Sequence, residues 1–250
     1  MAFTAPQRFY SLLNRVERLA AYAQGKGYGA ATMKQEVRLL QSLLRTQPEL
    51  AIDVGGNIGN YTAELRKVHP TLEIHTFEPS ATNIEKLRRR FKEDKLIKLV
   101  PYALSDSVGS ATLFSNEPGS GLSSLTQRKL DHFGITFDTE EKIKTIRFED
   151  YWKHELQSRK LDMVKIDIEG HELIALNGFG GALGATKALQ FEFGGCNIDT
   201  ATYFRDFWHY FKSNNFDIYR ITPFGSEKIA SYRESDEFFS TTNYIAVNRS

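Results

Sequence analysis

Short apolar segments alternate with helical segments from about residue 50 to the C terminus, and this alternation constrains the fold more than any other feature. Parallel strands need a crossover connection, usually a helix, so the pattern predicts a doubly wound α/β fold with a mostly parallel sheet. The expected strands are 50–54, 73–78, 97–104, 162–168, 188–193, 216–222 and 242–248. The expected helices between them are 58–68, 82–91, 171–179 and 200–213. The last two strands follow each other without an obvious helix, which predicts an antiparallel pair at one edge of the sheet.

Two further helices are expected before the first strand. Apolar residues recur at helical spacing in residues 6–24, and again from Met33 to Leu44, with the sequence GKGYG between the two segments. We therefore expect a helical extension over residues 1–46, followed by one domain over residues 47–250. The extension could cover the edge of the sheet, act as a lid on the active site or form a homodimer contact, and the sequence favours none of these.

The composition excludes several classes of protein. Lys and Arg number 32 and Asp and Glu number 31 among 250 residues, so the basic surface typical of a nucleic-acid-binding protein is not expected. Cys196 is the single cysteine, which excludes a disulfide or a Cys-rich zinc site within one chain. No signal peptide and no apolar run of roughly 20 residues is visible, so we expect no membrane span and a cytoplasmic location.

Residues 107–150 interrupt the strand–helix alternation. Two short β-like stretches, SATLFS and IKTIRF, flank the loop EPGSGLSSL. Long irregular segments in compact domains are usually functional, and ligands of such folds bind at the carboxyl ends of the strands. We predict an insertion over the site, with Ser123 and Ser124 as candidate contacts to a substrate.

A glycine-rich turn joins the first strand to its helix. It contains the candidate cofactor-binding residues Asp53, Gly55, Gly56, Asn57, Gly59 and Asn60. Glycines let the backbone approach a ligand, and a helix N-terminus offers free N–H groups. A dinucleotide-binding G-x-G-x-x-G would need glycine where Val54 stands. Asp53 could instead accept hydrogen bonds from a ligand cation. The alternative is a glycine turn without a ligand.

Polar residues end three other strands. Glu78, followed by Pro79, could accept both hydroxyls of a ribose, and Ser105 with Asp106 could contact the edge of an adenine. Glu192 is a candidate substrate contact near the end of the fifth strand. The structural alternatives are an exposed strand-end Glu78, an ordinary turn at Ser105–Asp106, and an ion pair of Glu192 with a neighbouring helix.

The segment KIDIEGHE carries the catalytic candidates Asp167, Glu169 and His171. Alternation places Lys165, Asp167 and Glu169 on one face of an otherwise apolar strand, and buried ionisable groups are costly unless they are paired or used. Carboxylates beside a histidine suit general base catalysis. Alternatively, Lys165 and Asp167 form a structural ion pair and His171 caps the next helix. No tight metal-ligand spacing is visible, so no metal is predicted, with a carboxylate-held divalent ion as a minor alternative.

Taken together, these segments resemble the FkbM-type methyltransferase family. The matching stretches run in the family's order from about residue 50 to residue 195: AIDVGGNIGNYT, HTFEPSATN, YALSD, SGLSSL, MVKIDIEGHE and LQFEF. Gly56 departs from the family, which often has Ala there. The resemblance implies the class I (Rossmann-like) methyltransferase fold, a seven-stranded sheet with an antiparallel last strand, and S-adenosylmethionine as cofactor.

The resemblance also implies roles for the candidates. The segment 53–60 would surround the methionine part of the cofactor, Glu78 would hold the ribose, and Ser105–Asp106 would border the adenine. Asp167, Glu169 and His171 would face the methyl group and a small-molecule or glycan acceptor. Members of the family typically O-methylate hydroxyls of sugars, glycans or polyketide-like natural products.

Two other functions stay open. An NAD-linked oxidoreductase would use a similar fold, and Val54 at the first glycine position argues against it. A catalytically silent binding module of the methyltransferase fold would need no base, and the intact run of acidic positions argues against that.

Overall fold

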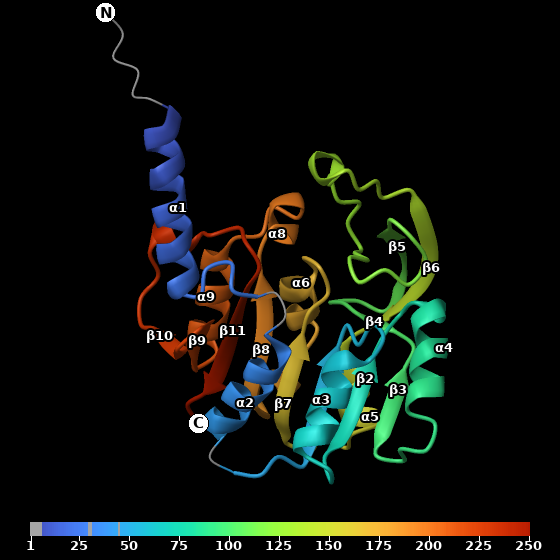
Figure 1. The fold of residues 1–250 in the computed structure, drawn as a ribbon. Coiled ribbons are helices and arrows are strands. Elements are labelled where there is room, and N and C mark those ends of the chain that lie inside the picture. The colour runs from blue at the N-terminus through green and yellow to red at the C-terminus, as the bar shows by residue number, and fades with distance from the viewer. Residues whose placement is uncertain (1–6, 30–31, 45) are drawn as a thin grey trace, which may run out of the picture.

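One twisted sheet of eight strands forms the centre of the molecule (Figure 1), in the order β10-β9-β11-β8-β7-β1-β2-β3. The structure, a computed structural model, describes residues 7–29, 32–44 and 46–250. The strands of this sheet are β1 Leu50–Val54, β2 Glu73–Phe77, β3 Ile97–Val100, β7 Leu161–Ile166, β8 Thr186–Phe193, β9 Phe216–Thr222, β10 Gly225–Ile229 and β11 Thr242–Asn248. The pairs from β8 through β7, β1 and β2 to β3 are parallel, whereas β11 is antiparallel to both β8 and β9. The predicted doubly wound α/β fold with an antiparallel last strand is confirmed.

Helices cover both faces of this sheet. The helices of the described residues are α1 Gln7–Ala23, which projects from the body, α2 Met33–Leu44, α3 Asn60–Val68, α4 Ala81–Arg90, α5 Phe148–His154, α6 Glu172–Asn177, α7 Gly181–Gly184, α8 Cys196–Asp199 and α9 Phe204–Ser213, with 3-10 turns at Asp131–Phe133 and Glu234–Asp236. Alternate residues of β1 enter different cores: Ile52 packs with side chains of α5, α6 and α9, and Ala51 packs with side chains of α2 and α3. Strands buried on both faces explain the continuous apolar runs in the sequence.

Two strands differ from the expectation. The expected strand 97–104 splits, because Pro101 has no N–H to continue the ladder, and β4 Ala103–Leu104 pairs with β6 Thr139–Ile146 in a second sheet. The unpredicted β10 forms a hairpin with β9, so the pair β9–β11 lies inside the sheet and β10 forms its edge. Residues 225–229 were missed because the strand is mostly exposed and its sequence, GSEKI, has little apolar signal.

The insertion forms a small sheet beside the main one (Figure 1), in the order β4-β6-β5. The expected β-like stretches become β5 Gly109–Ser115 and β6 Thr139–Ile146, which pair antiparallel. The chain then returns through α5 to β7. Residues 116–138 between β5 and β6 include the Gly- and Ser-rich loop predicted to lie near the site.

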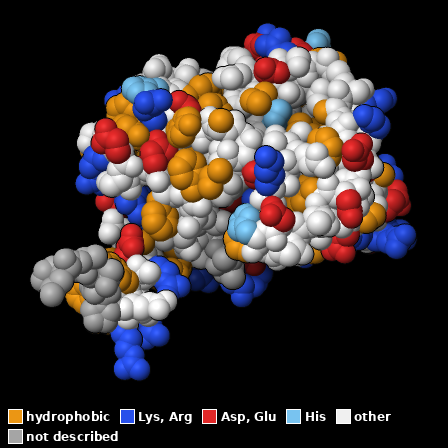
Figure 2. Space-filling view, turned by 90° about the horizontal axis from the view of Figure 1, so that it is seen from above, with side chains coloured by type: hydrophobic (Ala, Val, Ile, Leu, Met, Phe, Trp, Pro, Cys, Tyr) orange, Lys and Arg blue, Asp and Glu red, His pale blue; other side chains and the backbone are white. Residues whose placement is uncertain are grey.

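The two N-terminal helices differ in their packing. α2 buries Glu36, Val37, Leu40 and Leu44, and packs against α3, β8 and β11. α1 buries only Ala21 and stands away from the body of the molecule (Figures 1 and 2), with Phe9, Leu12, Leu13, Val16 and Leu19 exposed. The division at residue 46 and a homodimer through these helices stay predictions. None of the helices among the described residues combines the length and the apolar character that a membrane span needs.

Candidate active site

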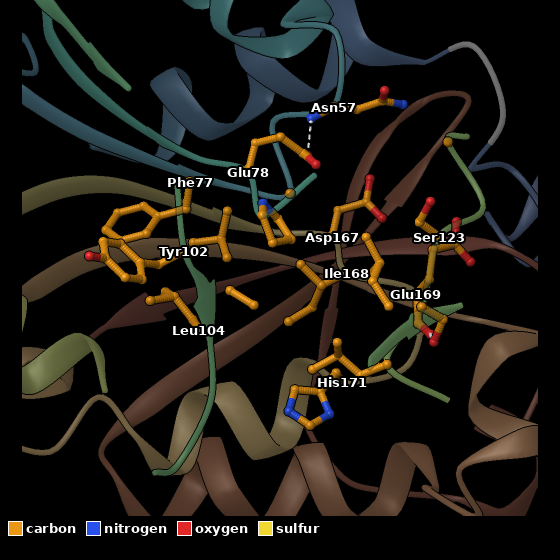
Figure 3. A pocket seen from close by; sticks show the side chains of 18 of the residues that line it. Asn57, Phe77, Glu78, Tyr102, Leu104, Ser123, Asp167, Ile168, Glu169 and His171 are labelled. Carbon is orange, nitrogen blue, oxygen red and sulfur yellow. Dashed lines mark hydrogen bonds between the residues drawn. The ribbon is translucent and has the colours of Figure 1, made fainter. Parts of the chain in front are cut away.

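A pocket of about 580 Å³, its open mouth included, lies at the carboxyl ends of β1, β2 and β7 (Figure 3). The sheet order reverses between β1 and β7, and ligands of open α/β sheets bind at such a switch point. Loop residues 120–125 form another part of the lining. Nine of the candidates from the sequence meet here: Gly55, Asn57, Glu78, Pro79, Ser123, Ser124, Asp167, Glu169 and His171.

Gly55 brings the chain close to both neighbouring strands. Its φ is +83°, and its N–H donates to Phe77 O at 3.0 Å. A Cβ added there would lie 2.0 Å from the backbone oxygen of Asp167, so only glycine fits without moving the end of β7. Gly56 and Gly59 lie outside the pocket lining. Added Cβ atoms there would meet Thr76 and Phe91, so packing of the turn accounts for both glycines.

Asp53 and Asn60 also lie outside the lining. Asp53 is fully buried at the end of β1, and its carboxylate accepts a hydrogen bond from the Thr62 hydroxyl at 2.6 Å. Lys165 Nζ lies 3.9 Å from its other oxygen. Burial raises the pKa of Asp53, and Lys165 opposes that rise. The structure therefore places Asp53 below the pocket, beside Lys165, and direct contact with a ligand cation stays a prediction.

Glu78 lines the pocket at the end of β2 (Figure 3), where only 6% of the residue is exposed. One carboxylate oxygen accepts the Asn57 N–H at 2.8 Å and the other accepts the Ser80 N–H at 2.9 Å. Burial raises the pKa of Glu78, and these two N–H groups counter the rise. Each oxygen keeps a second lone pair, so the carboxylate can still accept two hydroxyl hydrogens from a vicinal diol.

Asp167 lines the same pocket as Glu78 (Figure 3), directly after β7. Its carboxylate lies 3.1 Å from Lys165 Nζ, and its side chain is 35% exposed. The ammonium of Lys165 is buried and also lies 4.9 Å from the centre of the Tyr61 ring. Burial opposes the charge, yet Asp167 and Asp53 keep the pKa of Lys165 above its usual value. The ion pair considered as a structural alternative thus exists, and Asp167 lines the pocket as well.

Glu169 adds a second carboxyl group to the same wall. One oxygen each of Asp167, Glu169 and Glu192 lie within 4.8 Å of one another, although Glu192 does not line the pocket. Arg128 contacts Glu169 at 2.5 Å and Asp199 at 3.4 Å. Burial and the nearby Asp167 raise the pKa of Glu169 to about 8, which Arg128 opposes. Such oxygens could bind a divalent cation, but clustered acids alone do not define a metal site, and the expectation of no metal stays a prediction.

His171 lines the pocket immediately before α6. His171 occupies the N-cap position of α6, as the structural alternative supposed, but its side chain makes no capping hydrogen bond in the described part of the chain. Its Nε2 lies 3.2 Å from Ser105 Oγ. Burial lowers the pKa of His171, which favours the neutral imidazole. Ser105 and Asp106 lie outside the pocket lining, on the far side of this contact, and their proximity to an adenine stays a prediction.

Sequence reasoning missed two parts of the site. The first is an apolar wall formed by Phe77, Tyr102, Leu104, Leu113, Leu125 and Ile168. The break at Pro101 was the available signal for Tyr102, because it turns the chain out of the main sheet. The second is Glu172, whose fully buried carboxylate accepts the N–H groups of Ile168 and Gly170 and so fixes the turn that carries Glu169.

The sequence matches the family model described as the methyltransferase FkbM domain over residues 53–220. It is 24% identical over 191 residues to the 2-O-methyltransferase NoeI of Sinorhizobium fredii, across 73% of this chain and 78% of that protein. The methyltransferase sdnD of Sordaria araneosa is 29% identical over 152 residues, across 51% of this chain and 59% of that protein. Precorrin-6y C5,15-methyltransferase of Geobacter metallireducens GS-15 superposes with a TM-score of 0.44 at 10% identity, across 85% of this chain and 87% of that chain. Because the family match spans most of the chain, this protein belongs to the FkbM methyltransferase family.

Proposed function

We propose that this protein transfers a methyl group from S-adenosylmethionine to a hydroxyl oxygen of a sugar, glycan or natural product. The observation that carries the proposal is that Glu78 and Asp167 line one pocket (Figure 3), after the strands β2 and β7, with β1 and its Gly55 turn between those strands. The name of the relative NoeI, a 2-O-methyltransferase, supports oxygen as the acceptor atom.

The residues of the pocket fit the cofactor. Glu78 has lone pairs free for the two ribose hydroxyls, and the apolar wall with Phe77, Tyr102 and Leu104 suits a planar base. Gly55 lines the same pocket, and its missing side chain lets the turn pack against the backbone of Asp167. When bound, the cofactor supplies a sulfonium methyl group that is already a strong electrophile.

The protein must then orient the acceptor hydroxyl and take up its proton. Asp167 is the proposed proton acceptor, because its carboxylate is open to the pocket and is paired with the Lys165 ammonium. Glu169 is engaged by Arg128, and its raised pKa favours the protonated form at neutral pH, which suits it less to this role. Burial lowers the pKa of His171, which favours its neutral form, and it lines the same pocket. We propose that it shapes the part of the pocket that holds the acceptor. Orientation alone can supply up to roughly 7–11 kcal/mol in well-aligned reactions.

Labelled S-adenosylmethionine and a panel of sugars, glycans and natural-product alcohols test the proposal. We expect label in an O-methyl group of at least one acceptor, together with a rise in melting temperature on addition of the cofactor. If NAD raises the melting temperature and S-adenosylmethionine does not, the result would favour the oxidoreductase. Cofactor binding without transfer to any acceptor, including nitrogen and thiol compounds, would favour a silent binding module.

A further inference from the structure

A row of polar side chains crosses three neighbouring strands beneath the site. Asp53, Lys165 and Gln190 are paired in register across β1, β7 and β8. They follow the apolar residues Ala51, Met163 and Ala188, which pack with α2 and α3. The charged end of this row therefore lies under the pocket, and its other end lies beneath α2, which stands beside α3 (Figure 1).

Glu36 of α2 closes the far end of this row. It is 5% exposed, and its carboxylate accepts hydrogen bonds from Thr32 Oγ1 at 2.5 Å, Asn243 Nδ2 at 3.0 Å and Gln190 Nε2 at 2.7 Å. Burial raises the pKa of Glu36, whereas the hydrogen bonds from Thr32 and Gln190 lower it. An ionised carboxylate can only accept, so in that form Glu36 holds the amide nitrogen of Gln190 toward itself and the amide oxygen away.

The freed amide oxygen of Gln190 fixes Tyr61. It accepts the Tyr61 hydroxyl at 2.8 Å, in a fully buried setting. That hydrogen bond holds the phenol ring of Tyr61 against the Lys165 ammonium. The distance from Lys165 Nζ to the centre of the ring is 4.9 Å. A cation is attracted to the face of a buried aromatic ring, and the same ammonium contacts Asp167. Contacts thus run without interruption from α2 to the pocket.

We infer that Glu36 is a positioning residue for Asp167, acting through Gln190, Tyr61 and Lys165. Glu36 lies before the region matched by the family model, so the N-terminal segment contributes to the site through this relay. The inference rests on the proposed function insofar as Asp167 acts on the acceptor. The position of Lys165 can be tested without activity.

Glu36→Gln is the decisive variant. The new amide can donate to Gln190, which allows the Gln190 amide to turn over and removes the acceptor of the Tyr61 hydroxyl. We expect kcat to fall by roughly 10–100-fold, as for a small displacement of a reacting group, with cofactor KM unchanged within about twofold. Tyr61→Phe keeps the ring and removes the hydroxyl, so it should lower kcat in the same way. The double variant should lose little more than either single one, because both act on one relay.

Thr32→Val provides the matched control. It removes one hydrogen bond of Glu36 but leaves the bond to Gln190, so it should lower the melting temperature and spare kcat. If Glu36→Gln lowers only the melting temperature, or if the losses of Glu36→Gln and Tyr61→Phe multiply, the relay is refuted.

Crystal structures of the wild type and of Glu36→Gln separate this inference from the proposed function. The distance from Lys165 Nζ to Asp167, 3.1 Å in the native chain, should lengthen beyond hydrogen-bond reach in the variant. An unchanged distance would overturn the relay even in an active enzyme. A wild-type protein without methyl transfer would refute the proposed function and leave the structural comparison as the test of the relay.

Discussion

The two walls of the pocket hold their carboxylates in opposite ways. On the β2 wall, the backbone N–H groups of Asn57 and Ser80 donate to the two oxygens of Glu78. On the β7 wall, Asp167 and Glu169 lie close to Glu192, and in the described part of the chain Lys165 pairs with Asp167 and Arg128 pairs with Glu169. The first wall is held by backbone groups, whereas the second is held by ion pairs between side chains.

This difference indicates a division of work. A carboxylate held by backbone N–H groups keeps one geometry in every state of a reaction, which suits uniform binding of a cofactor. A carboxylate held by an ion pair between side chains responds strongly to a change in charge, which suits proton transfer. Substitutions on the β2 wall should therefore impair cofactor binding, and substitutions on the β7 wall should impair proton transfer.

The largest effect is expected where the walls meet, at Gly55. Gly55→Ala would place a Cβ 2.0 Å from the Asp167 backbone oxygen at a φ of +83°, so the turn and the end of β7 must separate. We expect cofactor binding to disappear in calorimetry and the melting temperature to fall. Gly134→Ala is the control, since it shares a positive φ of +70° but an added Cβ meets nothing within 4 Å. Normal affinity in Gly55→Ala would show that the cofactor does not use this turn.

Asp167→Asn should have the next largest effect. It keeps the shape and removes the charge, so kcat should fall by about 10²–10⁴-fold while cofactor affinity changes little. Asp162→Asn is a matched control, because Asp162 lies on β7 outside this pocket and the change breaks its ion pair with Lys187 of β8. A folded Asp167→Asn protein with normal kcat would leave only the structural ion pair with Lys165.

Glu78→Ala should weaken cofactor binding and leave the rate of methyl transfer nearly intact. Hydrogen bonds to a charged group contribute roughly 1.5–3 kcal/mol each, so cofactor KM should rise tenfold or more with kcat nearly intact. The melting temperature should also fall, because the N–H groups of Asn57 and Ser80 lose their acceptor. Steady-state kinetics with the cofactor varied would contradict this assignment if kcat fell and KM stayed constant.

The smallest effect concerns the pH dependence of stability. The pKa of Glu169 is about 8 in the folded chain and near 4.3 when unfolded, so the folded state binds the extra proton between these values. The contribution of Glu169 to the free energy of unfolding is therefore fully present below about pH 4 and is lost as the pH rises to 8. Glu169→Gln should flatten the fall in melting temperature between pH 5 and pH 8, by roughly 2–4 °C for each kcal/mol recovered. An unchanged slope would assign the pH dependence to Glu172 or Glu192.

Much of the architecture could be predicted from the sequence because its signals are local. The strand–helix alternation predicted the parallel core, and the carboxylates after β1, β2 and β7 predicted which edge carries the pocket. Parallel strands bring their carboxyl ends to one edge, so strand-end residues such as Glu78 and Asp167 could be placed together before any contact was known. The hairpin strand β10 lacked such a signal, since its exposed residues carry no periodic apolar pattern.

The same local signals could not separate residues that line the pocket from residues that support it. Asp53 and Glu78 both end a strand, yet one lies below the pocket beside Lys165 and the other faces into it. The direction of a strand-end side chain depends on the neighbouring strands and on the turn that follows, neither of which is encoded in the motif itself.

The sequence by itself determined the order of the elements, the family and the set of ionisable groups from which the site is built. Tertiary structure alone decided that α1 stands free while α2 buries a carboxylate, although both helices have apolar residues at helical spacing. Periodicity records that a face is apolar and does not record what covers it. The contacts of Glu36 with Gln190 and Asn243 join positions more than 150 residues apart, and such contacts exist only once the sheet has brought them together.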